Sequence, residues 1–277
     1  MTSASADLDA EFMFDRYLGR DEFDALGTLL MRHAPRWCTR ARVFRAPLEE
    51  VPVDLRTSGA LAAVVEHAAG ERGRTYSKQV ERFGKGDDRG QGSVELRGLG
   101  PELLVIVSID RRVFSRLAGR GHLGNEIAFQ LRARDVEKES AVVWLQRVFR
   151  DACARLSPAW AAGYATDEYW AKVMSERPVI RAAGRDFSRF LPGLFWLNFF
   201  GPRYVDFIGR ESLLSTPAPV VEQVDAGVLL GLGDDPARWN SNERRELDTA
   251  VLNVLGHDVF YSTDAPGRPT RAPSWTT

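Results

Sequence analysis

Three glycines at the spacing of a dinucleotide-binding loop are the first candidates for chemistry in this sequence. Gly119, Gly121 and Gly124 match the pattern G-x-G-x-x-G, in which backbone amides at the start of a helix hold a pyrophosphate. That mechanism needs a strand before the loop and a helix after it. Residues 126–134 instead alternate apolar and polar side chains, as a strand does. We therefore interpret the glycines as part of a loop and expect no cofactor.

Carboxylates and one amide are the next candidates. Asp234 and Asp235 resemble a pair for metal binding or acid–base work, but they precede Pro236, and Asp is favoured in turns because it bonds its own backbone. We favour the turn. Asn198 lies in an apolar segment, where an unpaired amide would cost about 1–3 kcal/mol, so we expect it to bond other protein groups. If the protein is an enzyme, Asn198, Asp225 and Asp234 are the residues expected to converge.

Sequence motifs for other catalytic or metal sites are missing. The chain contains no G-x-x-x-x-G-K-[ST], H-E-x-x-H, C-x-x-C or G-x-S-x-G, and its four histidines show no ligand spacing. We expect neither catalytic residues nor a metal site, although ligands from distant parts of a chain can assemble without a motif.

Composition narrows the class of protein and of partner. The net charge of −1 gives no overall attraction to nucleic acid or to a membrane. The apolar runs 103–107 and 194–197 are far shorter than the ~20 residues that cross a bilayer. The first ten residues lack the pattern of a signal peptide, and two cysteines are too few for a disulfide scaffold. We expect a cytoplasmic protein and leave its oligomeric state open.

The pattern of apolar residues predicts an α+β fold with a mostly antiparallel sheet, or sheets, flanked by helices. Alternation over 127–133 indicates a strand, whereas apolar spacing over 142–156 indicates the longest helix. We expect a disordered segment 1–10, a domain over 11–262 and an irregular Pro-rich tail over 263–277. Segments 84–165 and 190–262 are two candidate halves, in one sheet or two.

The second half holds the most distinctive segment of the chain. Residues 191–209 predict a buried strand over 193–200, a glycine turn and a helix opened by Pro202. We expect one long strand over 220–232 and a last short strand over 259–261. Charge is also uneven, because residues 211–258 hold nine acidic residues against three arginines. An acidic surface there would favour a basic partner.

These features of the second half, residues 191–209, 220–232 and 259–262, resemble the immunity protein 52 group of bacterial toxin-immunity proteins. The resemblance implies a non-enzymatic protein that binds a cognate toxin and neutralises it by covering its surface. The residues expected to contact the toxin are polar groups in and after the distinctive segment: Asn198, Arg203, Tyr204, Asp206, Asp234 and Asp235. Two alternatives stay open, an interaction or regulatory protein of a secretion system and an enzyme.

Overall fold

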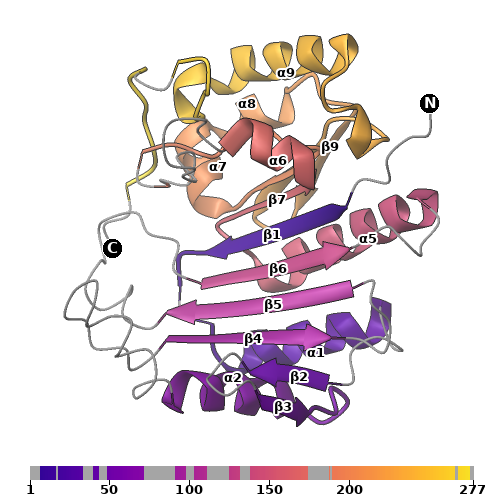
Figure 1. Cartoon of the computed structure of the whole chain (residues 1–277). Helices are drawn as coiled ribbons and strands as arrows, with labels where there is room; N and C mark the ends of the chain where they lie inside the picture. The colour runs from indigo at the N-terminus through magenta and orange to yellow at the C-terminus, as the bar shows by residue number, and fades with distance from the viewer. Residues whose placement is uncertain are drawn as a thin grey trace, which may run out of the picture.

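The computed structural model describes residues 7–16, 18–33, 40–43, 49–71, 91–97, 103–110, 125–131, 138–173, 187, 189–265 and 268–274. The described strands form one ten-stranded sheet in the order β3-β2-β4-β5-β6-β1-β7-β8-β10-β9, and neighbouring strands are antiparallel throughout (Figure 1). They are β1 (Leu8–Phe14), β2 (Arg40–Val43), β3 (Glu49–Pro52), β4 (Gln91–Arg97), β5 (Leu103–Asp110), β6 (Asn125–Leu131), β7 (Trp160–Ala165), β8 (Leu197–Phe200), β9 (Val220–Val224) and β10 (Gly227–Gly231). Segments 84–165 and 190–262 therefore contribute strands to the same sheet.

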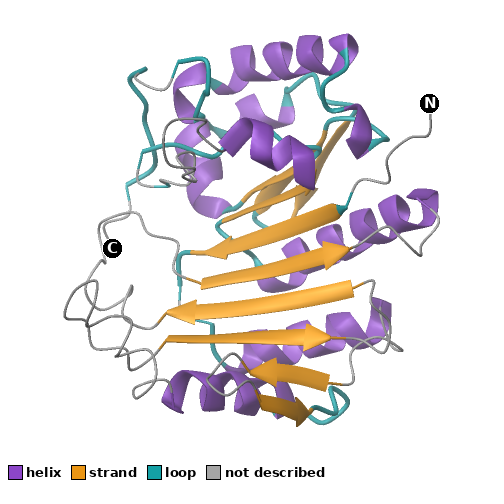
Figure 2. Ribbon diagram, in the orientation of Figure 1, coloured by secondary structure: helices purple, strands orange, loops and turns teal. Residues whose placement is uncertain are grey.

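Helices cover both faces of this sheet (Figure 2). One face is covered by α1 (Arg20–His33), α2 (Ala60–Glu71) and α5 (Lys138–Leu156). The other face, over the part from β7 to β9, is covered by α6 (Thr166–Val173), α7 (Pro202–Ile208), α8 (Arg210–Leu214) and α9 (Asn242–Leu255), with short 3-10 helices η2 (Pro236–Arg238) and η3 (His257–Val259). The predicted α+β class is confirmed.

Alternating side chains divide the core between the two faces. Along β1, Phe12 packs under α5, with its ring 5.3 Å from that of Phe149, whereas Met13 joins the cluster under α6–α9. The predicted alternation is confirmed over the described residues 127–131 by their burial pattern. The apolar stripe predicted for α5 is buried: Val142, Leu145, Phe149, Ala152 and Leu156. The second cluster contains several large aromatic side chains, among them Trp160 and Phe195, whose ring centroids lie 6.3 Å apart.

The N-terminal prediction is wrong for residues 8–10. We expected residues 1–10 to be disordered because they are small and polar, but β1 begins at Leu8 and lies between β6 and β7. Leu8 and Ala10 are buried and continue the alternation that leads to Phe12 and Phe14. The period-two pattern therefore outweighs the polarity of the flanking residues. Residues 1–6 and the glycine pattern at 119–124 lie outside the described residues.

The structure corrects three expectations in the second half. Residues 220–232 form a hairpin rather than one strand, because Asp225 takes a positive φ of 52° in a turn between β9 and β10. Residues 193–196 precede β8, which begins only at Leu197. The last short strand is replaced by η3 and a single parallel bridge between Leu191 and Phe260. The predicted glycine turn and the helix opened by Pro202 are both present.

Gly201 fixes the position of α7 because the chain passes directly against the residues before β7. Its amide donates to the carbonyl oxygen of Ala159 at 3.0 Å. A Cβ atom at this position would overlap the carbonyl oxygen of Pro158 and lie 2.8 Å from that of Ala159. Glycine is therefore required by close backbone approach, and α7 starts one residue later at Pro202.

Candidate partner-binding site

A buried ionic network joins helix α6 to helix α9. Glu168 of α6 is fully buried, and its Oε1 atom accepts hydrogen bonds from Lys172 Nζ at 2.9 Å and from Arg244 Nη2 at 3.2 Å. Asp248 of α9 pairs with the same two cations, Arg244 Nε at 2.7 Å and Lys172 Nζ at 3.1 Å. Two carboxylates thus balance two cations, which meets the requirement that buried charges be paired.

The same network is bonded to the backbone that precedes β8. Glu168 Oε2 accepts a hydrogen bond from the amide of Trp196 at 3.3 Å, and Lys172 Nζ donates to the carbonyl oxygen of Leu194. Because these bonds reach α6, α9 and the entry to β8, they fix the two helices relative to the sheet. The Trp196 indole adds a bond of 2.8 Å to the carbonyl oxygen of Gly233. This bond holds the segment after β10 in place.

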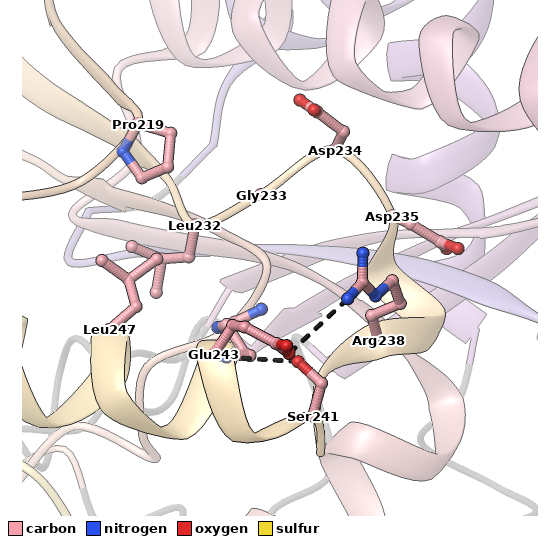
Figure 3. Close-up of a pocket in the computed structure, with 10 residues that line it drawn as sticks. Pro219, Leu232, Gly233, Asp234, Asp235, Arg238, Ser241, Glu243 and Leu247 are labelled. Carbon is pink, nitrogen blue, oxygen red and sulfur yellow. Dashed lines mark hydrogen bonds and ion pairs between the residues drawn. The ribbon is translucent and has the colours of Figure 1, made fainter.

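A shallow pocket of about 310 Å³ lies beside this network, at the open end of the β9–β10 hairpin, where β9 begins and β10 ends. Figure 3 shows Pro219, Leu232 and Leu247 on one side of the pocket and Arg238 on the other. The remaining lining residues come from the segment after β10 and the start of α9: Gly233, Asp234, Asp235, Ser241, Glu243 and Arg244. The pocket therefore has an apolar side formed around the hairpin and a charged side formed by η2 and α9.

The start of α9 supplies one negative charge, that of Glu243, to the pocket. Ser241 caps the helix by accepting a hydrogen bond from the amide of Arg244 at 3.2 Å. Glu243 Oε2 lies 3.5 Å from Arg238 Nη2 in an exposed ion pair. Hydrogen bonds from its own amide and from Ser241, together with the charge of Arg238, hold the pKa of Glu243 below its usual value.

Asp234 and Asp235 both line the pocket but have different roles. Asp235 Oδ1 accepts a hydrogen bond from the amide of Ala237 at 3.0 Å and caps η2, which confirms the predicted turn. Figure 3 shows the two carboxylates pointing in different directions, so they do not form a pair for a shared ligand. Asp234 is exposed, and in the part of the chain that the structure describes no side chain pairs with its carboxylate.

Asn198 and Tyr204, also expected to contact a partner, are buried in the isolated chain. Asn198 accepts a hydrogen bond from the amide of Phe195 at 2.9 Å and donates one to the carbonyl oxygen of the same residue at 2.7 Å. Its amide therefore shapes the turn into β8, as we favoured from the sequence. Tyr204 packs in the core beneath α7, and burial, with the nearby charge of Asp15, raises the pKa of its hydroxyl. Neither side chain offers a surface to a partner in this structure.

Arg203 and Asp206 lie on α7, away from the pocket-lining residues. Arg203 Nε is 3.1 Å from Asp15 Oδ2, and its Nη1 atom donates to the carbonyl oxygen of Ser274 at 2.7 Å. Arg203 thus ties α7 to the segment after β1 and to the C-terminal segment. Asp206 is exposed. Of the six predicted contact residues, Asp234 and Asp235 come together in the pocket.

The three residues expected to converge in an enzyme do not meet. Asn198 bonds Phe195 within its own turn, and Asp225 accepts a hydrogen bond from Ser157 Oγ at 2.9 Å. Asp225 and Asp234 lie beyond opposite ends of β10. Their positions supply no common site for a reacting group.

Two features are absent from the described part of the chain, a cluster of metal ligands and a membrane-spanning helix. There, no group of three or more His, Cys, Asp and Glu side chains is placed to hold a metal ion. No helix among the same residues has the length and apolar character needed to span a bilayer.

Sequence reasoning did not identify the ionic network. Glu168 with Lys172 and Arg244 with Asp248 are pairs four residues apart, a spacing that places both members on one face of a helix. The sequence contained that signal, but exposed helices carry the same pattern. Only the approach of α6 to α9 shows that the two pairs combine.

Comparison with known proteins identifies a similar fold. The structure is similar to that of the Pseudomonas aeruginosa T6SS protein PA0821, with a TM-score of 0.54 and 13% sequence identity, over 90% of this chain and 73% of that chain. This similarity shows a shared fold. No protein-family model matches the chain, and no curated protein matches it in sequence.

Proposed function

We propose that this chain is a non-enzymatic immunity protein that binds a cognate bacterial toxin and neutralises it by covering part of the toxin surface. The observation that carries the proposal is the pocket beside a network that fixes α6, α9 and the segment before β8. A surface fixed before binding loses little conformational entropy when it meets a partner. The resemblance of residues 191–209, 220–232 and 259–262 to the immunity protein 52 group supports the same function.

Exposed groups on the joined helices suit a protein interface. Trp170 of α6 is 52% exposed and makes an edge contact with the Tyr169 ring, 6.2 Å away. Tryptophan is enriched among the residues that contribute most to binding. Asp234 and Glu243 supply negative charge at the pocket, which would speed association with a basic partner.

A second candidate function is an interaction or regulatory protein of a secretion system. The observation that favours it is the similarity in fold to a protein whose name places it in a T6SS. Both candidates use a binding surface, and they differ in whether the partner is toxic.

Co-expression tests the proposal and separates the two candidates. The protein encoded beside this chain in its genome is expressed in a host with and without this chain, and a mixture of the purified proteins is examined by gel filtration. We expect the neighbouring protein to stop growth alone, growth to return with this chain, and the two to elute as one complex. A complex with a harmless protein would favour the second candidate, whereas continued killing without a complex would reject the proposed function.

Variants of the pocket acids refine the test. Asp234→Asn with Glu243→Gln removes two charges from the pocket, and we expect association to slow by about tenfold at low salt. Asp234→Asn alone is compared with Asp21→Asn, which also removes one charge, because Asp21 is an exposed acid in the first turn of α1 on the opposite face of the sheet. Equal association rates for both variants would exclude the pocket from the interface.

A further inference from the structure

β9 is an edge strand of the sheet. It pairs with β10 on one side and is the last strand in the sheet order of the described residues. An edge strand presents backbone amide and carbonyl groups that another extended chain can pair with. Val220, the first residue of β9, is 47% exposed, so an apolar side chain also marks the start of this edge. The strand at the opposite edge of the sheet, β3, lies far from the pocket in the sheet order.

The acidic pocket lies at the start of this edge. Pro219, which lines the pocket, directly precedes Val220, and Leu232 and Gly233 follow the end of β10. A chain that pairs with β9 therefore runs to or from the pocket. Side chains along such a chain alternate between the two faces of the sheet, so one side chain near its end can reach the pocket.

Charge indicates which side chain the pocket accepts. Asp234 contributes an exposed carboxylate that pairs with no side chain of the described residues, and Glu243 contributes a second carboxylate, which pairs with the exposed guanidinium of Arg238. The charge of Arg244 is already balanced within the ionic network by Glu168 and Asp248. The apolar side, formed by Pro219, Leu232 and Leu247, suits the methylene stem of a long side chain. Lysine and arginine combine such a stem with a positive charge.

We propose that the toxin binds by adding an extended segment to the β9 edge and placing a lysine or arginine of that segment in the adjoining acidic pocket. This inference rests on the proposed function and names the type of contact. A second copy of this chain is a poorer occupant of the edge, because its own β9 strand, Val220–Val224, contains no lysine or arginine to place in the pocket.

A peptide titration tests the edge without the toxin. The probe is a short peptide of alternating valine and lysine, and the control peptide has glutamate in place of lysine. Backbone amide shifts of this chain are followed by NMR during each titration. We expect the lysine peptide to shift amides of β9 and of residues 232–243, and to bind about tenfold more tightly than the glutamate peptide at low salt. Equal binding of both peptides, or shifts confined to other elements, would overturn the inference.

Two valine variants provide the matched comparison. Val220→Lys places a positive charge at the β9 edge, and we expect it to weaken binding of the lysine peptide by about tenfold. Val143→Lys makes the same change at an exposed valine of α5, and we expect no effect there. Self-association of the wild-type chain that is lost in Val220→Lys would assign the edge to a second copy and contradict the proposal.

The same variants separate the inference from the proposed function. If the neighbouring protein binds the wild-type chain and Val220→Lys equally well, the immunity function stands and the edge inference fails. If the wild-type chain binds the lysine peptide at β9 but neither binds nor neutralises the neighbouring protein, the edge is a peptide site and the proposed function fails.

Discussion

Replacing Glu168 with alanine should destabilise the protein more than any change to a surface ion pair. Glu168 is fully buried and accepts hydrogen bonds from Lys172, Arg244 and the amide of Trp196. Without its carboxylate, two cations share the single carboxylate of Asp248. Removing one partner of a buried ion pair typically costs about 3–5 kcal/mol because the other charge stays buried. Since Asp248 remains, we expect a loss of about 3 kcal/mol, near the lower end of that range.

Urea unfolding, followed by circular dichroism, measures this loss as a change in the midpoint at constant slope. The control is Arg56→Ala, which breaks the exposed pair between Arg56 and Asp54 and should cost about 0–1 kcal/mol. Glu168→Gln keeps an acceptor for the Trp196 amide and should fall between the two. A loss below about 1 kcal/mol for Glu168→Ala would show that the network does not hold α6 to α9.

Three further predictions concern the core and the turns. Gly201→Ala should destabilise the protein by about 1–3 kcal/mol in urea unfolding, because the added Cβ atom would overlap backbone atoms. Gly27→Ala, in the interior of α1, is the control and should be neutral or stabilising. Equal effects of the two substitutions would contradict the close approach at Gly201. Asn198→Ala should cost about 1–3 kcal/mol because it leaves buried backbone groups of Phe195 without partners, and an unchanged thermal midpoint would refute this. Because folding raises the pKa of Tyr204, stability is fully present below the ordinary tyrosine pKa of about 10 and falls above it. Tyr204→Phe should show a smaller alkaline loss, and an identical pH profile would exclude this cause.

Local patterns in the sequence predicted much of the fold. The stripe of α5, the alternation of β6 and the glycine–proline start of α7 each depend on neighbouring residues, so each could be identified without knowing the rest of the chain. The hairpin at Asp225 escaped prediction because its turn contains no glycine at the position with positive φ. Aspartate tolerates that conformation, but the apolar residues at 220–221, 224 and 228–230 favoured a single strand.

The order of strands and the ionic network could not be predicted in the same way. β1 lies between β6 and β7, and these contacts join residues more than a hundred positions apart in sequence. The charges of α6 and α9 likewise acquire their partners only through packing. The sequence identified Asp234 and Asp235 as polar residues of a turn, but only the fold places them beside Glu243 in one pocket.

The proposed function depends on one claim: this protein acts by covering part of the surface of its partner and does not modify the partner chemically. Titrating the purified chain into a fixed amount of the protein encoded beside it, with the proposed toxic activity of that protein as the readout, tests that claim directly. An occluding protein neutralises in proportion to its amount, so we predict a linear fall in activity that ends when the chain saturates the toxin in a complex of fixed composition. Complete neutralisation by an amount far below that of the toxin, or a toxin that stays inactive after the chain is removed, would contradict the account.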